Sequence, residues 1–171
     1  MQRIIYSLII LVLTSQSCLH KVQGDECALQ FYQVYKNKSL SLFENKSLYK
    51  RGKLIIYEMQ TEIGEGKKQI TFTYDSTLKK LSYKNKNDVL YSTHKSNLVM
   101  EEVKKILKIM EEYKIVGFHS EFKKNGVDLK FYFSCVNQLL FIKNREAISN
   151  KEWINQVNAS ESLDLNWFLI R

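Results

Sequence analysis

The chain of 171 residues contains no proline and only six glycines. Linkers between domains are usually rich in proline or in glycine and serine, so the sequence gives no sign of two joined domains. The scarcity of glycine also argues against sites in which the backbone approaches a ligand closely. We therefore expect one globular domain, and a chain of this length buries about 68–70% of its unfolded surface.

Recognised catalytic and cofactor motifs are missing as well. The three histidines are His20, His94 and His119, and no pair of His, Cys or acidic residues has the spacing of a zinc site. There is no glycine-rich phosphate loop, no Gly-x-Ser-x-Gly nucleophile elbow and no nucleotide-binding fingerprint. No catalytic residue, metal ligand or cofactor is assigned, and a non-catalytic role is favoured over an enzyme.

Acidic residues are the minority among the charged ones. The 26 Lys and Arg residues against 18 Asp and Glu residues give a net charge of +8. A positive protein attracts anionic partners such as nucleic acid, lipid headgroups or acidic proteins. Basic and aromatic residues interleave at Tyr35–Lys38, Tyr49–Arg51 and Tyr83–Lys86, a pattern that fits either stacking with phosphate binding or a solvated, lysine-rich strand face.

Residues 1–17 have the composition of an export signal. Arg3 is the only charged residue among them, the apolar run Ile4–Leu13 follows it, and Thr14–Ser17 are small and polar. The run is shorter than the roughly 20 apolar residues that a permanent membrane-spanning helix needs, and it fits a secretory signal peptide. We expect this segment to lie outside the folded domain.

Cys18 follows directly after Ser15-Gln16-Ser17. Here the chain resembles gram-negative lipoprotein precursors, whose short signal ends in a lipobox and whose cysteine becomes the lipidated first residue. Ser17 matches the small residue of the lipobox, whereas Ser15 and Gln16 depart from the strict pattern. The resemblance is therefore to a relaxed lipobox, and it covers residues 1–18.

The resemblance implies an address for the protein. It implies lipidation at Cys18, a short tether over residues 18–28, a globular domain over residues 29–171, and a location at the outer membrane or the periplasmic face of the cell envelope. An envelope location makes nucleic acid an improbable partner. Ordinary signal cleavage, after Ser17 or after Gly24, is the alternative and would give a secreted protein.

Cys27 and Cys135 are the two cysteines left if Cys18 carries lipid. An exported chain with two remaining cysteines is a candidate for one disulfide. Such a bond would tie the start of the domain to the late strand that we expect to carry Cys135. The alternative is a free thiol at Cys135, buried on the strand face that it shares with Phe131 and Phe133.

The stretch Asn97–Tyr113 predicts the main helix, with Ser96 or Asn97 as its cap. Apolar residues recur at steps of three and four, which places them on one side of a helix, and charged residues cover the other side. Leu98 and Leu107 widen the apolar side. Its remaining members are Val99, Val103, Ile106, Met110 and Tyr113.

Alternating apolar and polar residues predict strands on both sides of this helix. The segment Leu29–Tyr35 fits a helix or a strand, and Asn125-Gly126 is suited to a tight hairpin turn with positive φ at both central positions. Ser149 or Asn150 is expected to cap a short C-terminal helix. The predicted strands are Leu54–Met59, Ile70–Tyr74, Leu78–Tyr83, Val89–Thr93, Ile115–Lys123, Val127–Cys135, Leu139–Lys143 and Leu163–Ile170.

Together these elements predict an α+β fold, an antiparallel β-meander sheet packed on one main amphipathic helix. The favoured function is a small envelope lipoprotein that binds a macromolecule, such as an acidic protein, without catalysis, as an immunity or inhibitor protein or an accessory subunit would. The alternative is a hydrolase or transferase acting on envelope polymers. Its site would lie near His119 and Glu121, or would pair Cys135 as nucleophile with His119 as base.

Overall fold

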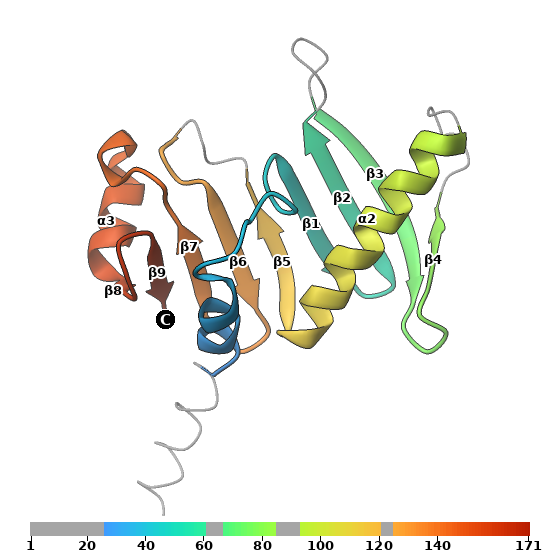
Figure 1. Ribbon diagram of the computed structural model, residues 1–171, viewed down its shortest axis with the longest axis horizontal. Helices are drawn as coiled ribbons and strands as arrows, with labels where there is room; N and C mark the ends of the chain where they lie inside the picture. The colour runs from blue at the N-terminus through green and yellow to red at the C-terminus, as the bar shows by residue number, and fades with distance from the viewer. Residues whose placement is uncertain (1–25, 61–66, 85–92, 121–124) are drawn as a thin grey trace, which may run out of the picture.

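The computed structural model describes residues 26–60, 67–84, 93–120 and 125–171. Within these ranges the chain forms one antiparallel sheet of nine strands with a long helix, a short C-terminal helix and a last strand, which confirms the predicted α+β class (Figure 1). The helices are residues 26–35, α2 (Thr93–Glu112) and α3 (Lys151–Ala159), with a 3-10 turn at Arg145–Ala147. The strands are β1 (Lys46–Arg51), β2 (Leu54–Gln60), β3 (Lys67–Asp75), β4 (Lys80–Tyr83), β5 (Ile115–His119), β6 (Leu129–Phe133), β7 (Gln138–Phe141), β8 (Glu161–Ser162) and β9 (Trp167–Ile170).

The sheet consists of two runs of neighbouring strands that the long helix connects. The order across the sheet is β4-β3-β2-β1-β5-β6-β7-β9-β8. The chain winds outward from β1 to the edge strand β4, and α2 then carries it back so that β5 pairs with the other side of β1 (Figure 1). A helix of 20 residues spans about 30 Å and four strand spacings span about 19 Å, so α2 is long enough to cross this half of the sheet diagonally.

One face of the sheet carries a continuous row of buried apolar side chains. Residues directly opposite each other on neighbouring strands point to the same face, so strand register alone aligns them. Every member of the row is at most 1% exposed, and we call this side the helix-covered face. From β3 to β9 the row consists of Ile70, Tyr57, Leu48, Phe118, Phe131, Leu139 and Leu169.

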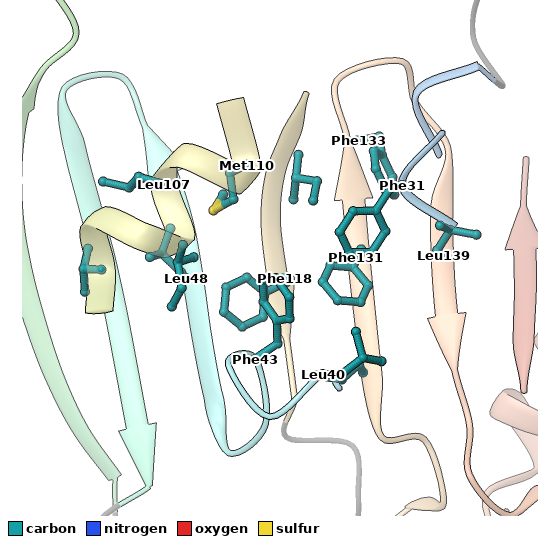
Figure 2. Packing of buried hydrophobic residues seen from close by; sticks show 14 of the residues in the cluster. Phe31, Leu40, Phe43, Leu48, Leu107, Met110, Phe118, Phe131, Phe133 and Leu139 are labelled. Atoms are coloured by element: carbon teal, nitrogen blue, oxygen red, sulfur yellow. The ribbon is translucent and has the colours of Figure 1, made fainter. Parts of the chain in front are cut away.

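Helix α2 packs on this face through the predicted apolar stripe. Val103, Ile106, Leu107 and Met110 are buried, and Figure 2 shows Leu107 and Met110 on the side of the helix that faces the sheet. Fully burying side chains of this kind stabilises the fold by about 1.5–3 kcal/mol each. Leu98, predicted to widen the stripe, is instead 59% exposed, so the stripe is narrower at the start of the helix.

The start of α2 differs from the prediction. The helix begins at Thr93, so Ser96 and Asn97 lie inside it and do not cap it. The strand predicted at Val89–Thr93 is wrong at Thr93, and its other residues lie outside the described part of the chain. The sequence favoured a start at Asn97 because the apolar periodicity begins there, whereas the helix extends one turn further with polar residues.

Two glutamates of α2 join the helix to the strands beneath it. Glu102 accepts hydrogen bonds from the Lys46 ammonium at 2.9 Å and from the Tyr57 hydroxyl. Glu111 accepts a hydrogen bond from the Tyr74 hydroxyl at 2.8 Å. Because these contacts reach β1, β2 and β3, they fix the position of the helix along the sheet as well as across it.

Strand β1 lies near the middle of the sheet, and the sequence pattern did not predict it. Leu48 points to the helix-covered face between Lys46 and Lys50, so the inward positions read basic, apolar, basic. The two lysines are accommodated by α2, since Lys46 pairs with Glu102 and the Lys50 ammonium lies 3.6 Å from Glu111. Because two of its inward side chains are charged and pair with α2, β1 lacks the alternation of apolar and polar residues from which a strand is predicted.

The N-terminal helix, residues 26–35, covers the other half of the same face. The ambiguous segment Leu29–Tyr35 is therefore helical. The Phe31 ring is fully buried, with its centroid 4.8 Å from that of Phe131 and 6.2 Å from that of Phe43 (Figure 2). Aromatic pairs at such distances add about 0.5–1.5 kcal/mol beyond their burial.

A second, smaller core lies on the opposite face, beneath α3. The Asn150 side chain accepts hydrogen bonds from the backbone N–H groups of Glu152 and Trp153, so of the two predicted caps it is Asn150 that caps this helix. The buried members of this core are Val127, Leu140, Ile142, Ile148, Val157 and Phe168.

The predicted tight hairpin at Asn125-Gly126 is wrong. Strand β5 ends at His119 and β6 begins only at Leu129, so the connection is much longer than two residues. Gly126 has φ +84°, but Asn125 is not among the described residues with positive φ. Val127 was expected to share a face with Leu129, yet it is buried in the second core, because the strand alternation does not reach back to it.

Candidate functional site

Over the middle of the sheet, no described helix lies on the face opposite α2. Of the described helical segments, α3 and the 3-10 turn lie on this side, and they cover its β6, β7 and β9 end. We call the positions that point to this side from β1, β2, β5 and β6 the open face. Strand register gives these positions as Ser47, Tyr49, Arg51, Leu54, Ile56, Glu58, Gly117, His119, Lys130 and Tyr132.

One row of the open face carries four polar side chains from four strands. Glu58 lies opposite Ser47, Ser47 opposite His119, and His119 opposite Lys130. Ser47 Oγ and His119 Nδ1 share a hydrogen bond of 2.5 Å. Ser47 is only 1% exposed, so its hydroxyl holds the imidazole in place and is not accessible as a nucleophile.

The neighbouring row is aromatic and includes a glycine. Tyr49 lies opposite Gly117, and Gly117 opposite Tyr132. A Cβ atom on Gly117 would lie 2.7 Å from Cδ1 of Tyr49, so the missing side chain makes room for the tyrosine ring. The Tyr49 centroid is 5.9 Å from that of His119 and 6.3 Å from that of Tyr132. The three rings thus form one contiguous aromatic patch.

Lys130 lies where this patch meets α3. Its ammonium nitrogen is 5.3 Å from the ring centroid of Tyr132 and 5.1 Å from that of Trp153, so it lies near two aromatic faces. Lys130 is only 8% exposed, and burial lowers the pKa of its amine below the ordinary value of 10.5. Burial also raises the pKa of the Tyr132 hydroxyl above 10.0.

The two cysteines predicted as a disulfide lie in the same core as free thiols. Cys27 belongs to the N-terminal helix, and Cys135 lies in the turn after β6, not on the strand as predicted. Burial raises the pKa of the Cys135 thiol above 9.0, and the neighbouring Cys27 thiol raises it further. The lipidation residue Cys18 and the signal segment 1–17 lie outside the described residues.

The structure separates Cys135 from the histidine proposed as its base. Cys135 packs against the core of the helix-covered face, whereas His119 belongs to the open face. The sheet itself therefore lies between thiol and imidazole, and a nucleophile–base pair of these two residues is ruled out. Glu121, the acidic residue suggested beside His119, is not among the described residues.

The three interleaved basic and aromatic segments do not form one stacking surface. Tyr35 packs against Phe31 in the main core, with ring centroids 4.4 Å apart. Tyr83 packs against Phe72 on the helix-covered face. Of the three tyrosines, only Tyr49 lies on the open face. The rings do not come together because Tyr35 belongs to a helix, and strand register places Tyr49 and Tyr83 on opposite faces of the sheet.

Ser47, Lys130, Tyr132 and Trp153 are site residues that the sequence did not single out. They come from β1, β6 and α3, which are far apart in the sequence, so no local motif joins them. In the part of the chain that the structure describes, no group of three or more His, Cys, Asp or Glu side chains is placed to hold a metal ion. Nor does any described helix have the length and apolar character needed to cross a membrane.

Comparisons with protein-family models, with curated proteins and with solved structures find no match for this chain. The candidate site is therefore defined by the geometry of its own residues.

Proposed function

We propose that this protein is a non-catalytic binding protein of the bacterial cell envelope, held to a membrane by lipid on Cys18. Its partner is a protein that presents an acidic segment to the open face. The observation that carries the proposal is the middle of the sheet, which no described helix covers on this side and where the Tyr132 and Trp153 rings lie beside the Lys130 ammonium. Binding surfaces are typically rich in tyrosine, tryptophan and arginine, and this face carries Tyr49, Tyr132 and Arg51, with Trp153 of α3 beside it.

The charge of the molecule supports an acidic partner. The net charge is +8, and removal of residues 1–17 with Arg3 leaves +7. The open face has two basic residues, the exposed Arg51 and the largely buried Lys130. Its acidic residue is Glu58, which is half-buried. Charge complementarity of this kind raises association rates and weakens as salt rises.

The enzyme alternative has one specific observation in its favour, the hydrogen bond between Ser47 and His119 with Glu58 in the same row. Acyl transfer by a serine needs an exposed hydroxyl beside a base and an oriented carboxylate. Burial of Ser47 removes the first of these requirements. Binding is therefore the better supported function.

Immobilised processed protein, incubated with envelope extract at low salt, tests the proposal. We expect capture of a specific acidic protein whose binding falls as salt is added. The purified partner is then titrated against two variants with the same change in net charge. Arg51→Glu on the open face should weaken binding by about tenfold or more, and Lys105→Glu on the exposed side of α2 by less than about twofold.

Equal effects of the two variants would show non-specific attraction and would contradict a site on the open face. His119→Ala separates the two functions. If this variant folds and retains partner binding yet loses a biological activity, the enzyme interpretation is correct and the binding proposal fails.

A further inference from the structure

Lys130 is a largely buried lysine for which the described part of the chain provides no counterion. It is 8% exposed, and among the described residues no carboxylate lies within ion-pair distance of its ammonium group. Its contacts are the rings of Tyr132 and Trp153. Aromatic faces attract a cation, but they leave its three N–H donors without strong acceptors.

An ammonium group that is partly withdrawn from water gains free energy when an anionic acceptor is supplied. Burial lowers the pKa of this amine, which is the direction expected for a charge that lacks compensation. The ammonium group lies at the border between α3 and the open face, near the Tyr132 and Trp153 rings.

The groups around the ammonium define what it can receive. The Tyr132 and Trp153 rings approach it from β6 and α3. His119 lies directly opposite Lys130 on β5. The nearest described acid of the same row is Glu58, two strands further from Lys130 than His119 is. An incoming anion therefore meets one cation and two flat aromatic walls, with the His119 ring on the neighbouring strand.

We propose that Lys130, Tyr132 and Trp153 form a recognition site for a single carboxylate, presented by a glutamate or aspartate side chain of the acidic partner. A phosphate group is usually held by several donors, from arginine forks, helix N-termini or glycine-rich turns, whereas Lys130 is the one cation described beside the Tyr132 and Trp153 rings. A carboxylate carries one charge, which one ammonium balances. The aromatic walls accommodate the aliphatic stem of the side chain.

This inference rests on the proposed function and names the group that is recognised. The test uses a fluorescein-labelled hexaglutamate peptide and measures its anisotropy with the processed protein. Lys130→Met removes the charge but keeps an unbranched stem, and it should weaken binding by roughly tenfold or more. Lys105→Met, the matched loss of one exposed lysine, should change the affinity by less than about twofold.

Thermal unfolding shows that the variant is folded. Lys130→Met should unfold at the same or a higher temperature than the unchanged protein, because an uncompensated buried charge has been removed. Protection of Lys130 from acetylation by the peptide, read by mass spectrometry, gives a second measurement in the unchanged protein. Protection of Lys130 in preference to exposed lysines is the expected result.

The remaining outcomes overturn the inference. Unchanged peptide affinity in Lys130→Met would show that the lysine is not part of the site, while loss of partner binding in Arg51→Glu would still uphold the proposed function. Competition by inorganic phosphate or by anionic lipid vesicles at lower concentration than acetate or hexaglutamate would assign the site to phosphate in place of carboxylate. Failure of all acidic proteins to bind would reject the proposed function itself.

Discussion

Left-handed backbone occurs at several residues that are not glycine. The chain has only six glycines, and four other described residues have positive φ values. They are Asn45, Lys79, Lys114 and Val136. Asparagine tolerates this conformation, but a β-branched residue is strained in it, because its Cβ approaches backbone oxygen. Val136, with φ 74°, is therefore the most strained of the four.

Val136→Gly should stabilise the protein. The side chain is 83% exposed and contributes little packing, so its removal costs little. Relief of the left-handed strain is worth about 1–2 kcal/mol, and the added freedom of the unfolded chain offsets about 0.5–1 kcal/mol of it. Urea unfolding should show a net gain of about 0.5–1 kcal/mol.

Lys79→Gly is the matched control for this prediction, since Lys79 is exposed, has φ 49° and is not β-branched. Its gain should be smaller than that of Val136→Gly. A loss of stability in Val136→Gly would mean that the valine side chain contributes packing that its exposure does not indicate.

Tyr74 gives the protein a pH-dependent contribution at alkaline pH. Its hydroxyl donates to Glu111 at 2.8 Å, and burial, followed by that hydrogen bond and by the glutamate charge, raises the pKa of Tyr74 from 10.0 to about 12. Because the folded-state pKa lies above the unfolded value, folding favours the protonated form. This stabilisation is complete below pH 10 and is lost as the pH rises to about 12.

We expect the free energy of unfolding to fall between pH 10 and about 12, with Tyr74 contributing about 1–3 kcal/mol of the fall. Tyr74→Phe removes the titrating hydroxyl and should reduce the slope over this range. Chemical unfolding at several pH values measures both profiles. Parallel profiles would show that Tyr74 does not carry this dependence.

Two helices cover one face of the sheet, and they are attached in different ways. Helix α2 combines an apolar stripe with contacts from Glu102 and Glu111 to the strands. The N-terminal helix, residues 26–35, packs mainly through Phe31 and other aromatic rings. Its first turn contains Cys27, which lies beside Cys135 in the turn between β6 and β7.

A disulfide between Cys27 and Cys135 should form when the protein is treated with a disulfide oxidant such as oxidised glutathione. In a Cys18→Ser background, which leaves two thiols, each cysteine loses one hydrogen and the oxidant is reduced. Closing a loop of about a hundred residues stabilises a fold by up to roughly 4.7 kcal/mol in the chain-entropy model. The raised pKa of Cys135 should make the reaction slow at neutral pH.

Intact mass and alkylation after oxidation measure the outcome, and the melting temperature should rise. Cys135→Ser in the same background should show neither change. Two alkylatable thiols after prolonged oxidation would establish that both cysteines are core residues only.

At the scale of the whole molecule, the sheet has two unlike sides. The helix-covered face buries the apolar row from Ile70 to Leu169, and the open face carries aromatic and positive groups. A protein tethered to a membrane at residue 18 would have only a short segment before the domain, whose helix begins at residue 26. The domain would therefore be held near the membrane surface.

Cys18→Ala tests the predicted anchor. The unchanged protein should partition into the detergent-soluble membrane fraction, and the variant should move to the soluble fraction or remain unprocessed, because the acyl acceptor is gone. Fractionation and intact-mass measurement provide the readout. A mature chain that begins at Asp25 and carries no acyl group would instead support ordinary signal cleavage after Gly24.

The sequence alone determined those elements whose signals are local. The apolar period of α2, the alternation in Ile70–Tyr74 of β3 and the Asn150 cap depend on residues within one or two turns of each other. These signals were enough to predict the α+β class. They were not enough to predict β1, because the charges that balance Lys46 and Lys50 belong to α2, far along the chain.

The candidate site was decided by tertiary structure. Ser47 meets His119, and Lys130 meets Trp153, only because β1 pairs with β5 and α3 packs beside β6. Strand register determines which side each residue faces, and a shift of one position would exchange the two faces. Register depends on the packing of the whole sheet, so local sequence determines the elements, whereas tertiary packing determines which side chains form the site.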